Sequence, residues 1–291
     1  MVKKKKITIC IFSIILLVAG SIAAIYFSID AKTKIDYDSF LFDKNEKHLI
    51  SSQDRILWDT GADITALFKD LSKNKKVIFL TPVFDYARKI SFYKHYFTKQ
   101  IKIDSVLIKN LIYIQLDSKE IANGIQELNI NGILGMNVIR KANWLIDFQE
   151  NKVDILPFDS VITDYNSKIK LSYKKKKYPF VTLEIQGIKT KKMLLDTGYN
   201  CDIKLFKSDI EEINKQITPD SVSNSFASVL FTDSIAEKKY FYSNITINSY
   251  TFDNLTITES CHRRLFGMEF LRKFDKVFWD SKNKEVKFYK N

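Results

Sequence analysis

ILWDTGAD (residues 56–63) is the most informative segment of this chain, and a close copy of it, MLLDTGYN, occupies residues 193–200. In both, a short apolar run leads directly into Asp-Thr-Gly. One Asp-Thr-Gly is expected by chance in about one of twenty chains of this length, so a single copy would say little. The second copy, with the same kind of apolar run before it, indicates a structural unit that occurs twice.

Two further blocks recur in the same order after each Asp-Thr-Gly. IKIDS (residues 101–105) is matched by ITINS (residues 245–249), and ILGMNVIRK (residues 133–141) is matched by LFGMEFLRK (residues 265–273). The chain has 8 glycines, and those at positions 61, 135, 198 and 267 all lie in the repeated blocks. A chain so sparing with glycine keeps it where the backbone needs space or freedom. The pattern therefore predicts an internal duplication.

The rest of the chain reads as a globular, mostly β protein. Hydrophobic residues make up 45% of it, and β-branched and aromatic residues gather in alternating runs that favour strands. We expect strands over residues 77–84, 101–108, 111–116, 181–185, 240–247 and 277–288, and short helices over residues 136–141 and 268–273. The predicted organisation is an N-terminal segment (1–31), a first lobe (32–158) and a second lobe (159–291), with a linker at Pro157–Ser167.

At the paired Asp-Thr-Gly motifs and their glycine-containing tails, the sequence resembles the retropepsin-like aspartic peptidases, with two lobes fused in one chain as in the pepsin-like arrangement. The resemblance covers about residues 50–291. It implies two β-barrel lobes related by a pseudo-twofold axis, and a monomer in which the lobes pair within one molecule. It also implies a catalytic dyad of Asp59 and Asp196, with the supporting loop residues Thr60, Gly61, Thr197 and Gly198.

A pair of carboxyl groups suits peptide hydrolysis, which needs an activated water and a proton for the departing amine. Two carboxyl groups about 3 Å apart cannot both ionise, so they share one proton and supply a base and an acid together. After the first motif, Ala62 and Asp63 match the family pattern, in which the acidic residue contacts the substrate backbone, whereas Tyr199 differs at the second. These three residues are the candidate substrate contacts, and we expect an asymmetric cleft. No metal site and no cofactor is expected.

The resemblance further implies hairpin flaps over the substrate. They are expected at residues 77–97, with a turn near 85–88, and at residues 225–242, with a turn near 232–234. No glycine occurs between Gly61 and Gly124 or between Gly198 and Gly267, so the glycine-rich flap tips of retroviral relatives are missing. Two functions stay open: an endopeptidase that acts on extended polypeptide, and a non-catalytic peptide-binding module with the same fold. Retention of both Asp residues favours the enzyme.

The N-terminus predicts export and a membrane anchor. Lysines at positions 3–6 precede an uncharged apolar stretch from Ile7 to Ile29, which is long enough as a helix to cross a hydrocarbon core of about 30 Å. The positive flank should stay in the cytoplasm, which gives a single-pass membrane protein with an extracytoplasmic catalytic part. The alternative is a signal peptide cleaved near the small residues 21–23, which would leave a secreted or periplasmic protein.

Charge and cysteine content narrow the partners. The net charge of +12 comes mostly from lysine, and the run Lys174–Lys177 lacks interleaved aromatic residues or a glycine-rich loop. We therefore expect a solvated loop there and no nucleic-acid partner. The expected partners are a peptide or protein substrate, and the membrane through the N-terminal segment. Outside the apolar segment, Cys201 and Cys261 are expected to be buried thiols in preference to a disulfide.

Overall fold

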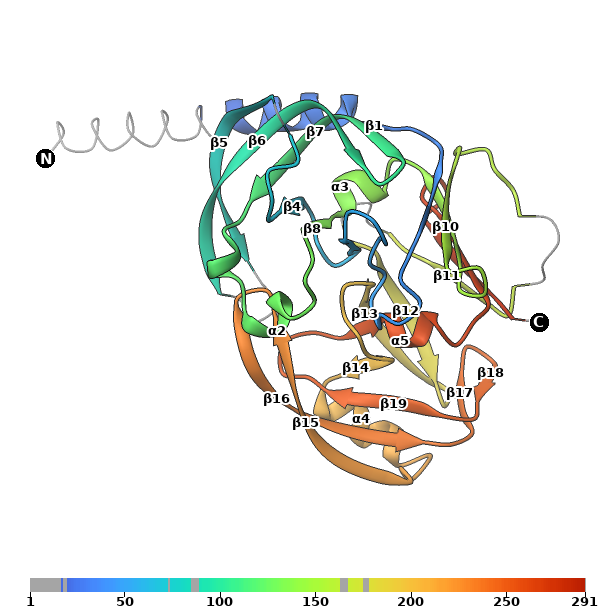
Figure 1. Cartoon of the computed structure of the whole chain (residues 1–291). Coiled ribbons are helices and arrows are strands. Elements are labelled where there is room, and N and C mark those ends of the chain that lie inside the picture. Colours follow the sequence, from blue (N-terminus) through green and yellow to red (C-terminus); the bar gives the residue numbers. More distant parts are fainter. Residues whose placement is uncertain are drawn as a thin grey trace, which may run out of the picture.

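The structure is a computed structural model that describes residues 17, 20–72, 74–84, 89–162, 167–174 and 178–290. These residues form a mostly β protein with short helices between the strands, which confirms the predicted class (Figure 1). Strands β1–β10 belong to the first half of the chain, blue to green in Figure 1, and strands β11–β22 to the second half, yellow to red. The run at 174–177 and the turn expected at 85–88 lie wholly or largely outside the described residues.

The first half builds a sheet around the strand that leads into Asp59. Its order among the described residues is β3-β8-β4-β7-β6-β5, with β1 beside β7. β3 runs parallel to β8, β8 is antiparallel to β4, and β4 runs parallel to β7. The strands are β1 (Lys34–Ile35), β3 (Ile56–Trp58), β4 (Thr65–Leu67), β5 (Lys75–Phe84), β6 (Ile90–Ile103), β7 (Val106–Gln115) and β8 (Gly132–Leu134).

The second half builds a sheet in which these pairings recur. β13, which ends at Asp196, runs parallel to β20; β20 is antiparallel to β14, and β14 runs parallel to β19. The order over the described residues is β15-β16-β19-β14-β20-β13-β12-β17-β18. The strands are β12 (Phe180–Ile185), β13 (Ile188–Asp196), β14 (Ile203–Leu205), β15 (Ser221–Val229), β16 (Thr232–Tyr242), β17 (Ile245–Ile247), β18 (Tyr250–Phe252), β19 (Leu255–Glu259) and β20 (Leu265–Gly267).

A third sheet joins the two halves. Its order is β11-β22-β21-β9-β10-β2, and the halves meet where β9 pairs with β21. Trp144 lies opposite Trp279 at this junction, and its ring packs 4.4 Å from the ring of Trp58, directly before Asp59. The sheet thus places an aromatic core beneath the first Asp-Thr-Gly loop. The strands are β2 (Ser39–Leu41), β9 (Asn143–Asp147), β10 (Lys152–Leu156), β11 (Ile169–Ser172), β21 (Lys276–Asp280) and β22 (Glu285–Tyr289).

The helices between the strands are short. α3 (Met136–Ile139) and α5 (Met268–Leu271) begin directly after Gly135 and Gly267, as predicted, and their apolar side chains are buried. A helix that the sequence did not predict, α4 (Lys207–Asn214), buries only Ile210 and Ile213, so its apolar signal was weak. The remaining short helices are η1 (Ser118–Glu120) and α2 (Asn123–Gln126).

Three predicted strands are each interrupted by a turn, and two of them, residues 101–108 and 277–288, are hairpins. Residues 101–108, 240–247 and 277–288 each contain a tight turn, because Asp104, Asn244 and Lys284 adopt left-handed backbone angles with φ of 50°, 57° and 58°. The two hairpin turns contain no glycine or proline that would mark a turn. The predicted flap hairpins are formed by β5 with β6 and by β15 with β16. The second turn lies at residues 230–231 and not near 232–234, because Val229 pairs with Thr232.

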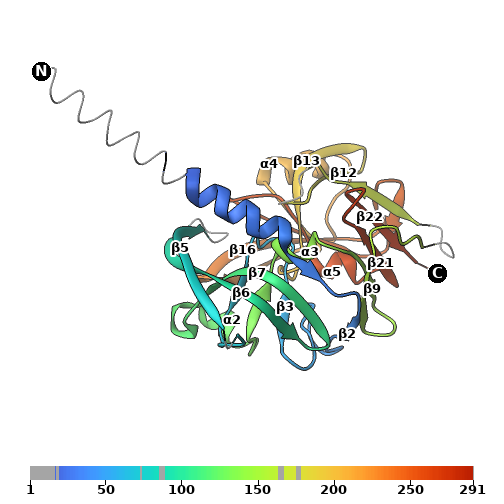
Figure 2. The same ribbon diagram turned by 90° about the horizontal axis from the view of Figure 1, so that it is seen from above.

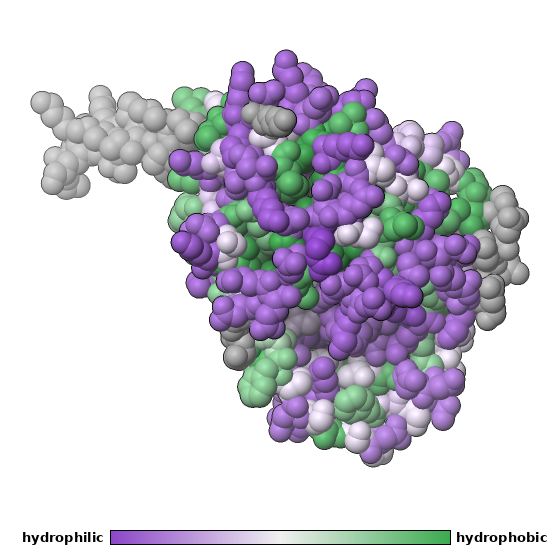
Figure 3. All heavy atoms as spheres, viewed as in Figure 1, coloured by the Kyte–Doolittle hydropathy of each residue, from purple (hydrophilic) through white to green (hydrophobic). Residues whose placement is uncertain are grey.

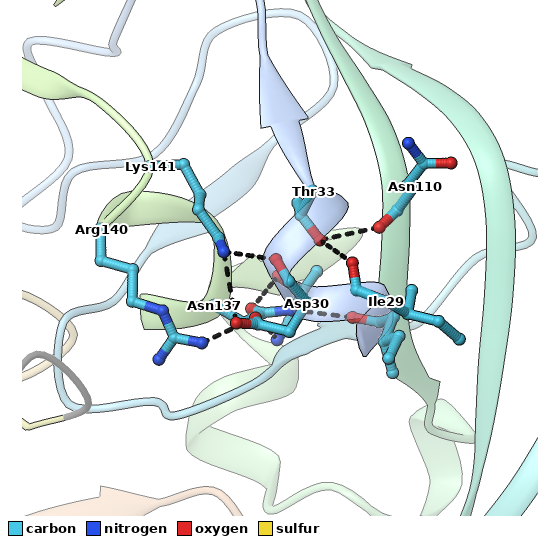
Figure 4. Close-up of polar contacts among 9 residues, drawn as sticks. Ile29, Asp30, Thr33, Asn110, Asn137, Arg140 and Lys141 are labelled. Atoms are coloured by element: carbon cyan, nitrogen blue, oxygen red, sulfur yellow. Dashed lines mark hydrogen bonds and ion pairs between the residues drawn. The ribbon is translucent and has the colours of Figure 1, made fainter. Parts of the chain in front are cut away.

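A helix at residues 20–32 lies across the top of the first-half sheet, beside β5, β6 and β7 (Figures 1 and 2). Asp30 holds its end through ion pairs to Arg140 (2.6 Å) and Lys141 (3.2 Å), directly after α3 (Figure 4). In the described part of the chain no helix has both the length and the apolar character needed to cross a membrane. Most of the apolar stretch before residue 20 lies outside the described residues.

Candidate active site

Each Asp-Thr-Gly loop is seated on the glycine of the matching tail motif. The N–H of Met136 donates to the carbonyl oxygen of Ala62, and the N–H of Met268 donates to that of Tyr199, both at 2.8 Å. A Cβ on Gly135 would lie 2.7 Å from the backbone of Ile64, and one on Gly267 would lie 2.4 Å from the backbone of Cys201. Glycine recurs in the tails because the loop backbone packs directly on it.

The structure brings Asp59 and Asp196 together, although 136 residues separate them along the chain. Their carboxyl groups hydrogen-bond to each other, and both side chains remain partly exposed. Each carboxyl group covers the glycine of the opposite loop: a Cβ on Gly61 would lie 2.4 Å from Asp196 Cγ, and a Cβ on Gly198 would lie 2.4 Å from Asp59 Cγ. The two carboxyl groups can approach only because neither glycine has a side chain.

Two buried threonines tie the loops to each other. The N–H of Thr60 donates to Thr197 Oγ1 at 3.1 Å, and the N–H of Thr197 donates to Thr60 Oγ1 at 3.0 Å. The hydroxyl groups then donate across the interface, from Thr60 to the carbonyl oxygen of Leu195 at 2.8 Å and from Thr197 to that of Trp58 at 2.6 Å. Every polar atom of this network has a partner in the opposite half, which fixes the relative position of the two carboxyl groups.

The electrostatics of the pair are unequal. Burial raises the pKa of Asp59, although the N–H groups of Gly61 (2.7 Å) and Ala62 (3.1 Å) donate to its Oδ1 and favour its charged form. Burial raises the pKa of Asp196 well above its usual value, and the neighbouring charge of Asp59 raises it further. Within its own loop, Asp196 accepts from the N–H of Gly198 at 3.1 Å. The backbone therefore holds a negative charge better on Asp59.

The candidate substrate contacts lie beside the dyad in different surroundings. Ala62 contributes its N–H to Asp59, as given above, and Asp63 accepts a hydrogen bond from the hydroxyl of Tyr178 at 3.2 Å. Tyr178 belongs to the second half and was not singled out from the sequence, since 115 positions separate it from Asp63. Tyr199, the counterpart of Ala62 in the second motif, has different partners.

Tyr199 lies on a buried ion pair that sequence reasoning missed. Its hydroxyl donates to Glu237 Oε1 at 2.8 Å, and Lys204 Nζ bonds both groups and lies 3.8 Å from the centre of the Tyr199 ring. The side chains of Lys204 and Glu237 are 1% and 5% exposed, and burial lowers the pKa of Lys204. Glu237 comes from β16, so this ion pair connects the second hairpin to the loop after Asp196.

The first hairpin also carries a buried polar group on its inner face, at a different position from that of Glu237. His95 on β6 is buried, its Nε2 lies 2.6 Å from Thr81 Oγ1, and burial lowers its pKa to about 4, against the smaller opposite effect of the Asp63 charge. His95 is therefore neutral above about pH 5. The inner faces of both hairpins thus approach the loops that follow Asp-Thr-Gly.

The tip of the second hairpin contacts the first half. The N–H of Ala122 donates to the carbonyl oxygen of Leu230 at 2.9 Å, and Lys89 Nζ donates to that of Phe231 at 3.1 Å. The Phe231 ring is buried and stacks 5.9 Å from the ring of Tyr93 on β6. In Figure 1 the orange β15–β16 hairpin reaches the green α2 and the first-half hairpin at the left of the molecule.

Cys201 and Cys261 are both free thiols. Cys201 is buried, and burial raises the pKa of its thiol well above the usual value, which disfavours the reactive thiolate. Cys261 is exposed, contrary to the expectation of two buried thiols.

Among the described residues, no three His, Cys, Asp or Glu side chains are grouped so that they could hold a metal ion. Neither the protein-family models nor the curated proteins contain a match to this chain.

Proposed function

We propose that the protein is an aspartic endopeptidase of the two-lobed, retropepsin-like kind, with lobes at residues 32–158 and 159–291. The observation that carries the proposal is the reciprocal contact of each carboxyl group with the glycine of the opposite loop, at 2.4 Å from an added Cβ on either side. The threonine network and the recurring strand pairings of the two sheets support a pseudo-twofold relation between the lobes.

In the proposed reaction the dyad carries one proton between its two carboxyl groups. Asp59, with more backbone donors, is the carboxylate that removes a proton from the attacking water, and Asp196 is the acid that protonates the carbonyl oxygen of the substrate. The resulting tetrahedral diol collapses when its C–N bond breaks. The proton taken up by Asp59 passes to the departing amine, and Asp196 recovers its proton from the diol.

The substrate is an extended polypeptide held between the loops and the inner faces of the two hairpins. Asp63 would accept backbone N–H groups on one side, whereas the Tyr199 ring, fixed by Lys204 and Glu237, would offer an aromatic surface on the other. The apolar stretch Ile7–Ile29 would anchor the protein as a single-pass membrane protein with its catalytic part outside the cytoplasm. Cleavage of a signal peptide, which would release a secreted or periplasmic enzyme, is the alternative.

The test uses the full chain in detergent micelles, because the helix at residues 20–32 packs on the first half. Wild type, Asp59→Asn, Asp196→Asn and the control Asp253→Asn are incubated with a diverse peptide library from about pH 3 to 8, where a carboxyl pair titrates. Asp253 is exposed on the surface. We expect mass spectrometry to show cleavage by wild type and Asp253→Asn and none by the dyad variants; equal cleavage by either dyad variant would refute the proposal.

A non-catalytic peptide-binding module is the second candidate. It is favoured by the tip of β15–β16, which is held on the first half by the Ala122 and Phe231 contacts described above. A pinned hairpin and a scarcity of glycine would restrict the opening that turnover requires. The same library distinguishes the two functions, because a binding module retains peptides on the well-folded wild-type protein without cleaving them.

A further inference from the structure

The β5–β6 hairpin carries apolar side chains on both of its faces. Its inner face buries residues such as Phe79 and Tyr93. Its outer face, which we call the hairpin patch, consists of Leu80, Pro82, Phe84, Ile90 and Phe92, and all five are exposed. Phe84 pairs with Ile90 and Pro82 with Phe92, and the exposed fractions of Phe84 and Phe92 reach 60% and 66%. An antiparallel strand with one face in water ordinarily alternates apolar and polar residues, so this outer face is unusual.

The matching hairpin of the second half shows that the architecture does not require such a face. The outer positions of β15 and β16 include Asn224 and Lys238, which pair with each other, and the exposed large apolar side chains of these strands, Val222, Phe226 and Phe241, do not pair with one another. Among the described residues, a face of paired, exposed apolar side chains therefore occurs on the first hairpin and not on the second. Figure 3 shows hydrophobic atoms gathered at the upper left of the molecule, beside the start of the described N-terminal helix.

The N-terminal helix continues the hairpin patch. Tyr26 turns inward and lies 6.2 Å from the Phe79 ring of β5, which places the helix directly beside the hairpin (Figures 1 and 2). On the outer side, Ile25 and Phe27 are 48% and 67% exposed. Between residues 20 and 29 the helix has no charged side chain. Its outward face is thus uncharged, like the hairpin patch.

The helix has a fixed direction relative to the hairpin. Besides the ion pairs of Asp30, the Thr33 hydroxyl donates to the carbonyl oxygen of Asn110 at 2.7 Å (Figure 4). The Asn110 amide donates to the carbonyl oxygen of Lys32 at 3.1 Å. The last third of the apolar stretch Ile7–Ile29 therefore lies against the first half. A bilayer that encloses the whole stretch must reach the level of β5 and its outer face.

The charges around the hairpin patch indicate what kind of partner covers it. β5 and β6 contain no acidic residue. Lys94, which pairs with Leu80 of the hairpin patch, is exposed, as are Lys76 on β5 and, farther along β6, Lys99 and Lys102. Lysines that flank inserted apolar side chains attract anionic lipid headgroups. A second copy of the chain would bring the same lysines against them, so charge complementarity favours a bilayer.

We propose that the hairpin patch and the outer face of the N-terminal helix form one surface that inserts into the headgroup region of an anionic bilayer. This rests on the membrane anchor stated under the proposed function. It goes further, because it places the outer side of one flap hairpin on the membrane. The cleft would then lie close to the bilayer surface, and the preferred substrates would be the membrane-proximal segments of membrane-associated polypeptides.

The test measures contact with lipid and does not depend on peptidase activity. The full chain is reconstituted in vesicles of phosphatidylcholine and phosphatidylglycerol in equal parts, with or without brominated acyl chains, which quench tryptophan on contact. Phe84→Trp and Phe92→Trp probe the hairpin patch, and Phe226→Trp, on the second hairpin, is the matched control because Phe226 is 75% exposed. The native Trp58, Trp144 and Trp279 are buried and give the same background in every variant.

Side chains of an interfacial surface insert by about 5–10 Å. We therefore expect the brominated vesicles to quench about half of the tryptophan emission added at positions 84 and 92. The tryptophan emission added at position 226 should stay unchanged. Unquenched probes at positions 84 and 92 in vesicle-bound protein would overturn the proposal. Quenching of these probes by iodide in the water would then show that the surface is open, and protection from iodide would show that a protein partner or a second copy covers it. Equal quenching at position 226 would also overturn it. Failure of the chain to float with vesicles would overturn the anchor and this proposal together, without bearing on the dyad.

Discussion

Substitution of Gly61 by alanine should abolish most of the proposed activity while the fold is kept. The added Cβ would lie 2.4 Å from Asp196 Cγ, whereas an ordinary contact begins at 3.4 Å, so the carboxyl group or the loop must move by about 1 Å. The backbone angle of Gly61 is not in the left-handed region, so alanine itself fits the chain there. The loss therefore comes from the displaced carboxyl group.

The magnitude follows from the geometry of the dyad. A misplacement of about 1 Å at reacting groups reduces the rate by about 100-fold, or about 2.7 kcal/mol of transition-state stabilisation. Gly198→Ala should give the same loss, because its Cβ would lie 2.4 Å from Asp59 Cγ. Gly187→Asn is the control, since Gly187 has open space around it and a φ of 78°, which asparagine tolerates.

The assay is the turnover of the best peptide from the library, together with thermal unfolding of each variant. We expect both alanine variants to unfold cooperatively and to lose at least about 100-fold in kcat, and Gly187→Asn to match wild type. A folded Gly61→Ala protein with wild-type kcat would refute the reasoning, because the carboxyl groups would then not need the spacing seen here.

Three further predictions concern stability. A pKa that is raised in the folded state contributes stability that is present at low pH and lost as the pH rises. Asp196→Asn should therefore raise the melting temperature at pH 7 to 8, and this gain should vanish towards about pH 3 to 4. A gain that persists at low pH would contradict this. Thr60→Val leaves a buried carbonyl and a buried N–H of the second half without partners. It should therefore lower the free energy of unfolding, measured by urea titration, by about 2–4 kcal/mol. The control Thr251→Val, at an exposed position, should change the free energy of unfolding little. Lys204→Met should lower the free energy of unfolding by about 3–5 kcal/mol, because it leaves the Glu237 charge buried and unpaired. The double variant Lys204→Met, Glu237→Leu should recover most of this stability. Failure to recover it would show that the two side chains do not act as a pair.

Local signals in the sequence were sufficient for the elements that flank the dyad. The apolar runs before Asp59 and Asp196 form strands, and the tail glycines begin short helices, as expected. The hairpin turns at residues 104–105 and 281–284 were missed because neither contains a glycine or a proline that would mark a turn.

The repeated blocks and the mostly β class could be read from the amino acids alone, because strand periodicity and the need for glycine under a loop are local properties. The folded arrangement of the chain decided that the two carboxyl groups hydrogen-bond, that Tyr178 reaches Asp63, and that Lys204 pairs with Glu237 beneath Tyr199. It also decided that the first hairpin exposes an apolar face beside the N-terminal helix. The reason is that these contacts join positions far apart in the chain, and their geometry is set by how three sheets pack together and not by the residues next to them in sequence.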